Sequence, residues 1–209
     1  MRRVKREELR TLSIFLAEQL YEIEPFKSMM TGIYPQKAKL LIAEKFYGQF
    51  AHPFYRNVDV FVNGDDISGV IIGMNCKKQS LLYYMPVFIS VLKIAFVLCT
   101  NQERKRIIQN MKPIKAVLGA KWFKKFCKEA PYYLAVFAID KASRGTGLCR
   151  VMIEYFFEYA KTISTSIVLE THTKGNVPMY EHFGFELAEA KETADGTITE
   201  YRMIRKLLG

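Results

Sequence analysis

The sequence has few of the side chains that build metal centres or disulfide frameworks. Its four cysteines are far apart and form no CxxC pair: Cys76, Cys99, Cys127 and Cys149. With only three histidines besides, we predict no metal site and no disulfide framework. Thiols that stay reduced are typical of a reducing compartment, so we expect a cytoplasmic protein.

Internal repeats, low-complexity linkers and a recognisable leader are also lacking. The 209 residues, half of them hydrophobic, are enough for one large domain, and we predict a single domain over residues 1–209. The basic start, MRRVKREELR, continues to Glu18 without a small-residue cleavage site. We therefore expect an amphipathic helix there in place of a signal peptide.

Acidic residues are too few to balance the basic ones. The chain has 31 Lys and Arg against 21 Asp and Glu, which gives a formal charge of +10. Such an excess suits an anionic partner, whether nucleic acid, acidic lipid or a polyphosphate cofactor. Composition alone favours a solvated basic surface over any of the three.

One apolar run is long enough to raise the question of a membrane span. Residues 81–99 are nearly all apolar, but they include Pro86 and, near the centre, Lys93. We therefore expect a buried or lipid-lying helix and no integral span.

The apolar run opens a predicted helical insertion at about residues 81–130, with breaks near Thr100-Asn101 and Lys112-Pro113. Its end, KAVLGAKWFKKFCKEA, interleaves aromatic residues with lysines. This pattern favours a helix that packs its aromatic rings on the core and leaves its lysines in solvent. Peripheral membrane contact, a lid over an acceptor site and a dimer surface stay open, whereas no nucleic-acid partner is expected.

Hydrophobic periodicity predicts the remaining elements of a mixed α/β fold. Helices are expected at residues 5–24, 36–50 and 176–185, strands at 132–139 and 166–171, and hairpins turning at Asn63-Gly64-Asp65-Asp66 and at Asp195-Gly196. A further helix is expected after residue 147. The residues that share its apolar face are Leu148, Val151, Met152, Tyr155, Phe156 and Tyr159.

Two glycines lie one residue apart in IDKASRGTGLCRVMI, residues 139–153. Between a strand and a helix, such a loop aims backbone N–H groups at one point beside the positive end of the helix dipole, which suits a phosphate. A P-loop is excluded because no lysine follows either glycine. The GxGxxG fingerprint is excluded because Arg150 stands where the third glycine should be.

These residues resemble the acyl-CoA-binding motif of the GCN5-related N-acetyltransferase (GNAT) superfamily, in which a strand leads into [Q/R]xxGx[G/A]. The matching segment is RGTGLC, residues 144–149, after the strand residues Phe137, Ala138 and Ile139. Two residues depart from the pattern. Cys149 replaces a small Gly or Ala and is expected to crowd a diphosphate slightly, and Lys141 stands where proline is frequent.

A second segment, LETHTKGNVPMYEHFGF at residues 169–185, resembles another signature of the same superfamily: a strand end, Asn, a short helix with Tyr, then Gly-Phe. The resemblance covers residues 132–206. It implies an α/β fold of the GNAT type, with a mixed, mostly antiparallel sheet and helices on both faces. Strands 132–139 and 166–171 would be its central splayed parallel pair, and the helical insertion would be an addition to it.

The resemblance implies an enzyme that transfers an acetyl group from acetyl-CoA, a cosubstrate, to a primary amine by direct attack in a ternary complex. It implies that Tyr180 protonates the departing thiolate, with Glu170 as the candidate base and the backbone N–H groups of 137–139 around the developing oxyanion. The implied cofactor-binding residues are Phe137, Ala138, Ile139, Arg144, Gly145, Thr146, Gly147, Leu148, Cys149, Asn176 and Tyr180.

Several residues have a second interpretation. Asn176 is expected to cap its helix, with or without a bond to the pantetheine arm. Glu170 also fits an exposed strand-end carboxylate, and Tyr180 fits ordinary packing. His172 and His182 are interpreted as surface histidines, with His182 packed on its neighbours.

Basic side chains near the loop are expected to help hold the phosphates: Arg144, Arg150 and Lys174. The alternative to an enzyme is a non-catalytic acyl-CoA-binding sensor or interaction module with the same fold. A small-molecule or peptide amine as acceptor, an acetyl or a longer acyl donor, and a monomer or a homodimer all stay open.

Overall fold

The computed structural model describes residues 1–51, 58–78, 81–119 and 121–207. Asn57 and Ala120, which fall within the predicted first hairpin and the predicted insertion, lie outside the described residues.

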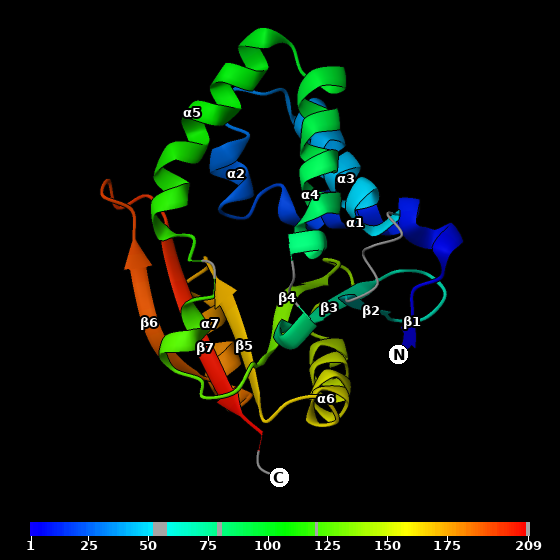
Figure 1. The fold of residues 1–209 in the computed structure, drawn as a ribbon. Helices are drawn as coiled ribbons and strands as arrows, with labels where there is room; N and C mark the ends of the chain where they lie inside the picture. The colour runs from blue at the N-terminus through cyan, green and yellow to red at the C-terminus, as the bar shows by residue number, and fades with distance from the viewer. Residues whose placement is uncertain (52–57, 79–80, 120, 208–209) are drawn as a thin grey trace.

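One seven-stranded sheet runs through the molecule in the order β1-β2-β3-β4-β5-β7-β6 (Figure 1). Neighbouring strands are antiparallel except for β4 and β5, which are parallel. This mixed sheet confirms the predicted fold class. Its strands are β1 (Arg2–Arg3), β2 (Val58–Val62), β3 (Gly69–Asn75), β4 (Tyr132–Ile139), β5 (Ser166–Thr171), β6 (Glu186–Glu192) and β7 (Thr199–Lys206).

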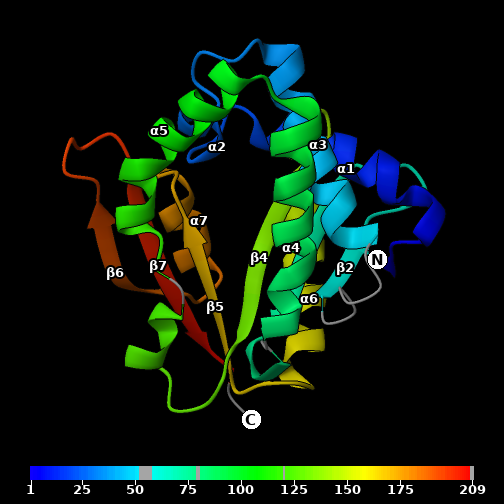
Figure 2. The ribbon, with the colours of Figure 1, turned by 45° about the horizontal axis from the view of Figure 1, so that its top comes forward.

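Helices cover both faces of this sheet (Figures 1 and 2). The helices are α1 (Leu9–Leu20), α2 (Phe26–Met29), α3 (Pro35–Ala51), α4 (Leu81–Lys93), α5 (Asn101–Val117), α6 (Leu148–Lys161) and α7 (Asn176–His182). Helices α1 and α3 pack on one face of β2–β4, where Leu12, Leu41 and Val70 share a core. Helices α6 and α7 pack on the opposite face, where Phe156, Leu169 and Tyr180 share another.

The two central strands separate soon after they meet. β4 pairs with β5 only through Tyr132–Ile167, Tyr133–Val168 and Leu134–Leu169. Directly after the last pair, a bulge leaves Ala135 without a partner on β3, since Gly73 pairs with Leu134 and Ile72 with Val136. Leu134 belongs to the α6 core and Val136 to the α1–α3 core. The splayed parallel pair predicted from the resemblance is therefore present.

The insertion forms a helical hairpin, with one predicted break present and one absent. A π-helical turn, Ile94–Leu98, follows α4, and Thr100 caps α5 by accepting a hydrogen bond from the Glu103 amide at 3.2 Å. The break predicted at Pro113 is wrong, because Pro113 lies inside α5. Burial of Ile114 and Val117 in the next turn holds the helix together despite the missing N–H. None of the helices in the described ranges has the length and apolar character to span a membrane.

The predicted apolar face of α6 is displaced by about one position. The buried residues are Met152, Ile153, Phe156, Phe157 and Ala160. Val151 and Tyr155, which were expected on that face, keep 57% and 38% of their surface exposed. Tyr155 instead lies at the edge, where its ring packs against Phe61 at 5.2 Å between centroids.

Gly73 is expected to be essential for the packing beside the bulge. A Cβ at Gly73 would lie 2.5 Å from the ring and hydroxyl of Tyr132, which is fully buried and donates a 2.6 Å hydrogen bond to Asp59. Gly73→Ala should lower the free energy of unfolding by about 1–3 kcal/mol in urea titration, because overpacking displaces a rigid ring. Gly175→Ala, where a Cβ meets nothing within 4 Å, should change it by less than about 1 kcal/mol. Equal losses for the two variants would contradict this account.

Candidate functional site

Because β4 and β5 separate, the later part of β4 is hydrogen-bonded to a neighbouring strand on one side only. In an antiparallel ladder, alternate residues bond to the neighbouring strand. Asp140 donates to Ser68 at 2.9 Å, so Ala138 and Val136 are the residues that bond to β3 in the same ladder. The N–H groups of Phe137 and Ile139 therefore point away from β3, toward β5, whose pairing with β4 ended at Leu134. Of the three predicted strand residues, Phe137 and Ile139 face this gap.

The glycine loop joins the end of β4 to α6. Gly145 and Gly147 have φ angles of +79° and +85°, a left-handed conformation that other residues rarely adopt. A Cβ on either glycine would meet nothing within 4 Å, so open space lies beside both. Ser143 donates its amide to Asp140 at 2.6 Å, and Thr146 donates its hydroxyl to the Ser143 carbonyl at 2.7 Å. These local bonds fix the shape of the loop.

The loop ends at the N-terminus of α6, whose first amides have no partner within the helix. Gly147 is the N-cap and supplies no side-chain cap, and the first helical bond recorded there runs from Val151 to the Gly147 carbonyl. Leu148 and Cys149 occupy the first turn. The Cys149 thiol lies 3.9 Å from the Met179 sulfur, so this side chain is directed toward α7.

Tyr180 lies on α7 and is 7% exposed. Burial, with a smaller contribution from the Cys149 thiol, raises the pKa of its phenol, so the hydroxyl stays protonated at neutral pH. Its ring packs edge-on against Phe185 at 5.6 Å. Within the described residues the hydroxyl forms no recorded hydrogen bond.

Asn176 does not cap α7, which corrects one prediction. The N-cap is Gly175, and Asn176 is the first helical residue. The Asn176 amide donates instead to the Thr171 hydroxyl at 3.3 Å. It thereby ties the start of α7 to the end of β5, which fixes where the helix carrying Tyr180 begins. Gly184, with φ +80°, ends the helix as predicted.

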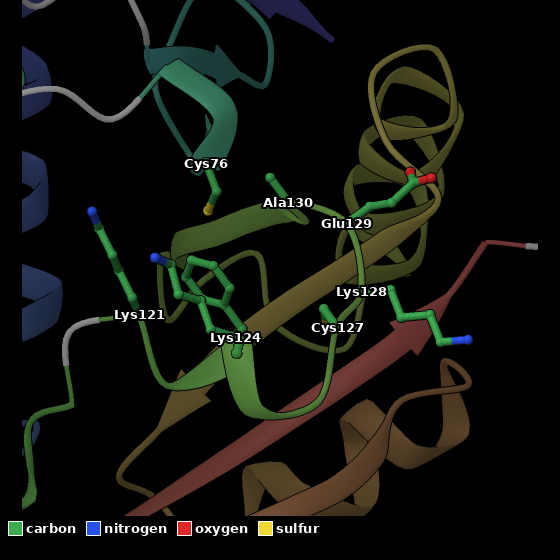
Figure 3. A pocket seen from close by; sticks show the side chains of 8 residues that line it. Cys76, Lys121, Lys124, Cys127, Lys128, Glu129 and Ala130 are labelled. Atoms are coloured by element: carbon green, nitrogen blue, oxygen red, sulfur yellow. The ribbon is translucent and has the colours of Figure 1, made fainter.

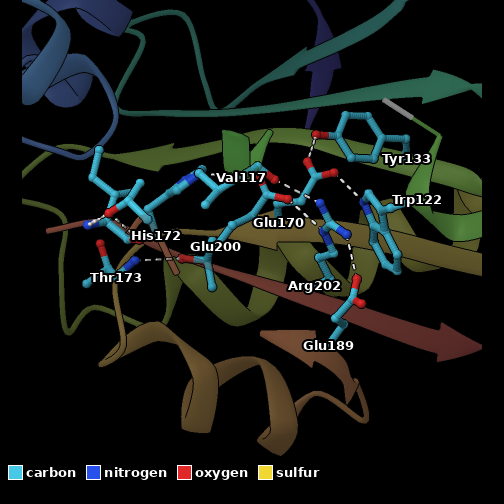
Figure 4. A network of polar contacts seen from close by, with 12 residues as sticks. Val117, Trp122, Tyr133, Glu170, His172, Thr173, Glu189, Glu200 and Arg202 are labelled. Carbon is cyan, nitrogen blue, oxygen red and sulfur yellow. Dashed lines mark hydrogen bonds and ion pairs between the residues drawn. The ribbon is translucent and has the colours of Figure 1, made fainter. Parts of the chain in front are cut away.

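Glu170 is the residue after the last β4–β5 pair, and its carboxylate is enclosed (Figure 4). It accepts hydrogen bonds from the Trp122 indole and the Tyr133 hydroxyl. Burial raises the pKa of this carboxyl, although both hydrogen bonds act in the opposite direction. The interpretation of Glu170 as an exposed strand-end carboxylate is therefore wrong.

Tyr133 and Trp122, which orient Glu170, were not among the predicted site residues. Tyr133 could be placed beside Glu170 only by knowing the register of two strands far apart in the chain. Trp122 comes from the short helix Trp122–Lys125 after α5. In this segment Trp122 and Phe123 are buried and the lysines are exposed, as the sequence favoured, but Phe126 keeps 40% of its surface exposed.

A buried ion cluster lies next to Glu170 on the same sheet (Figure 4). Arg202, which is opposite Glu170 in the β5–β7 register, bonds to Glu200 at 2.7 Å and Glu189 at 2.5 Å, and to the Val117 carbonyl at 2.9 Å. Its guanidinium leaves no room for a side chain at Gly119, where a Cβ would lie 2.2 Å from Nη2. Arg202 therefore joins β7 to β6 and to the end of α5.

The two histidines are in different surroundings. His172 was expected at the surface, but its side chain is only 12% exposed, with Nε2 3.6 Å from a Glu200 oxygen and no hydrogen-bond partner. Because His172 directly follows β5, its side chain points toward the ion cluster. His182 is exposed and packs on Phe183 at 5.4 Å, as predicted. It also lies 3.0 Å from Arg150.

Glu170 and Tyr180 lie on opposite faces of the sheet. Successive β5 side chains alternate between faces. Leu169 packs in the core that contains Tyr180, whereas Val168 packs with Trp122 and Phe123. Glu170 therefore points to the Trp122 face, beside the gap that opens after Leu134. Tyr180 is buried in the core on the other face, which it shares with Leu169.

A pocket with a volume of about 420 Å³ lies away from this gap. It is at the amino end of β4 (Figure 3), at the opposite end of the strand from the glycine loop. Burial raises the pKa of Cys76, one of its lining residues, to about 12, so this thiol is protonated at neutral pH. The remaining lining residues are Lys121, Phe123, Lys124, Cys127, Lys128, Glu129 and Ala130. None of them belongs to the predicted site, and the described residues contain no cluster of side chains that could hold a metal ion.

Comparisons with known proteins give matches among solved structures. A histone acetyltransferase HPA2 and related acetyltransferase from Corynebacterium glutamicum has a TM-score of 0.64 at 15% identity, over 100% of this chain and 96% of that one. An N-acetyltransferase from Staphylococcus aureus has 0.61 at 16%, over 97% and 98%. Arylalkylamine N-acetyltransferase 2 from Aedes aegypti has 0.56 at 13%, over 99% and 98%. No family model and no curated protein matches the sequence.

At such identities the likeness establishes the fold alone. It extends over nearly the whole chain. Together with the splayed β4–β5 pair, it confirms the resemblance to the GNAT superfamily at the level of the fold.

Replacing Glu170 by glutamine is expected to change how stability depends on pH. Because the folded state raises the pKa of Glu170 above its usual 4.5, this carboxyl stabilises the fold fully below that value and loses its contribution as pH rises through the folded pKa. Glu170→Gln stays neutral and can still accept from Trp122. Its unfolding free energy relative to wild type should therefore rise between pH 4.5 and 8 in urea titrations. A difference that stays constant or falls with pH would contradict a raised pKa.

Proposed function

We propose that the protein is an N-acetyltransferase that uses acetyl-CoA as cosubstrate and acetylates a primary amine by direct attack in a ternary complex. The observation that carries this proposal is the convergence of three features on the gap between β4 and β5. These are the outward-facing β4 amides, the open glycine loop, and the carboxylate and phenol on opposite faces.

The residues present fit a CoA molecule. Its diphosphate needs backbone donors with no side chains in the way, which the loop at Gly145 and Gly147 and the start of α6 provide. Arg144 and Lys174 are exposed near the ends of β4 and β5. Arg144 donates to the Ile139 carbonyl at 3.3 Å and to Gln19 at 3.5 Å, which are long bonds to neutral groups, so it can still turn to a phosphate. Arg150 is engaged with His182 and, at 3.6 Å, with Glu154. We therefore assign it a smaller part in binding.

The pantetheine arm carries amide groups that need hydrogen-bond partners. The N–H groups of Phe137 and Ile139 and the Phe137 carbonyl would bond to them in the manner of a neighbouring strand. The Ile139 carbonyl already accepts from the Arg144 guanidinium at 3.3 Å. Asn176, tied to Thr171, holds α7 in place beside the arm. In this arrangement Leu148 and Cys149 line the inner side of the diphosphate site, while Ala138 contributes packing alone because its amide is used by β3.

Acetyl-CoA supplies a thioester carbonyl that an amine can attack. Glu170 would take the proton from the attacking amine, directly or through one water, and its raised pKa suits a base working near neutral pH. Trp122 and Tyr133 keep its carboxylate oriented. The outward-facing β4 amides would stabilise the negative charge that develops on the carbonyl oxygen. Tyr180 would give its proton to the departing sulfur. The acceptor is a small-molecule or peptide amine.

The loop glycines are expected to be required for cofactor binding. Gly147→Ala should weaken CoA binding at least tenfold by isothermal titration calorimetry, because the added Cβ enters the open space and disfavours the left-handed backbone. Gly64→Ala is the matched control, because its φ of +63° carries the same strain in the β2–β3 turn. It should leave CoA affinity unchanged. If wild type does not bind CoA, the proposal is wrong.

Tyr180→Phe should slow acetyl transfer about 10²–10⁴-fold with little change in CoA affinity, because it removes a proton donor and keeps the ring that packs on Phe185. The measurement is thiol release from acetyl-CoA over a panel of amines. An unchanged rate would remove Tyr180 from the mechanism. CoA binding without thiol release from wild type, over a broad panel, would favour the non-catalytic sensor.

A further inference from the structure

The positive charge of the chain is concentrated in the insertion. Residues 81–130 contain ten Lys and Arg but only two acidic residues, Glu103 and Glu129. This segment therefore carries +8 of the formal charge of +10. A cofactor phosphate site at the loop of residues 144–149 does not explain this concentration, because the insertion is a different part of the chain.

Most of this charge is not neutralised within the protein. In the described part of the chain, one of the ten basic residues forms an ion pair with a carboxylate, Lys125 with Glu189 at 3.3 Å. Lys93, Lys105, Lys112 and Lys115 are exposed on α4 and α5. Long-range attraction to an anionic partner is therefore available along the hairpin.

The same hairpin exposes apolar side chains. Eight of the sixteen exposed large hydrophobic residues in the described ranges lie between Met85 and Ile108. Helix α4 packs on α3 through Ser90, which is 4% exposed and lies against Gly48. Three- and four-residue spacing puts an apolar stripe on the opposite side, formed by Met85, Phe88, Ile89, Leu92 and Phe96, which are 39–72% exposed.

Charge and apolar surface meet at the turn between the helices. Phe96 and Val97, in the π-helical turn, are 72% and 69% exposed. Arg104, in the first turns of α5, places its guanidinium 5.2 Å from the centre of the Phe96 ring. The turn lies at the end of the molecule farthest from the C-terminus (Figure 1). It can therefore reach a flat surface before the sheet does.

We propose that the α4–α5 hairpin, residues 81–117, binds the surface of membranes that contain anionic lipids. Its apolar stripe and tip would enter the boundary between headgroups and acyl chains, and its lysines and arginines would lie at headgroup phosphates. This is binding in the plane of the interface. It involves no spanning helix and does not depend on the proposed enzyme activity.

Two other occupants fit the surface less well. A second copy in a two-fold arrangement would bring the same basic segment against itself, with like charges facing each other. A nucleic acid would satisfy the lysines but leave Ile89, Leu92 and Val97 against a charged backbone or water, since nucleic-acid surfaces are met by polar and stacking contacts. A lipid surface satisfies both the charges and the apolar stripe.

The test is co-sedimentation of the full chain with two kinds of vesicle. One kind is pure phosphatidylcholine, and the other contains equal amounts of phosphatidylcholine and phosphatidylglycerol. Binding is expected only to the anionic vesicles and should weaken as salt rises. Lys93→Ala/Lys105→Ala should lower the partition coefficient by about 25-fold, roughly fivefold for each charge. Leu92→Ser/Phe96→Ser should lower it at least tenfold, through lost apolar burial.

The matched control is Leu187→Ala/Lys191→Ala, which removes an exposed apolar and an exposed basic residue from β6. It should partition like wild type. Circular dichroism checks that all variants fold. The proposal is overturned if wild type ignores anionic vesicles or binds both kinds equally. It is also overturned if the hairpin variants lose self-association or RNA binding while vesicle binding is unchanged.

Discussion

Backbone donors and acceptors in the interior of a sheet need partners, and this requirement governs the centre of the molecule. β4 and β5 hydrogen-bond to each other over three residue pairs, and their pairing then ends. The groups of Phe137 and Ile139 are left facing a gap in the middle of a seven-stranded sheet. The glycine loop follows the end of β4, and the enclosed carboxylate of Glu170 comes directly after the last β4–β5 pair. A single interruption of strand pairing thus leaves outward-facing backbone groups, an open glycine loop and a carboxylate at one place in the sheet.

Local patterns in the sequence were enough to predict most elements, and the family resemblance predicted the parallel strand pair. Compact apolar runs and turn residues identify strands, and the two glycines at positive φ identify the loop. Predictions failed where tertiary contacts outweigh local preference. Pro113 stays inside α5 because the following turn is buried, and Asn176 bonds to Thr171 in preference to capping its own helix. The buried face of α6 differs from the predicted one, because Tyr155, which was expected in it, packs its ring against Phe61 at the edge instead.

The surroundings of Glu170 could not be read from the sequence at all. Its partners come from a strand and a short helix that are 37 and 48 residues away along the chain. The neighbouring ion cluster adds Arg202 from β7, with Val117 from the end of α5. Rules based on residue spacing describe neighbours within one helix or strand and carry no information about contacts between distant segments. The insertion therefore has two parts with different roles. Its end supplies Trp122 to the Glu170 carboxylate, while its helical hairpin, residues 81–117, exposes lysines and apolar side chains.

The bulge at Ala135 has a consequence for how β4 is compared between related chains. Leu134 faces the α6 core, and Val136, two positions later, faces the α1–α3 core. The extra residue therefore reverses the alternation of side chains. Even-numbered positions face the α6 core before the bulge and the α1–α3 core after it. An alignment that runs through this strand without a gap, against a chain that lacks the bulge, equates residues from opposite cores. Deleting Ala135 alone would make Leu134 and Val136 neighbours, which already face opposite cores. The strand would then alternate regularly, and the side chains beyond the deletion would keep their present faces.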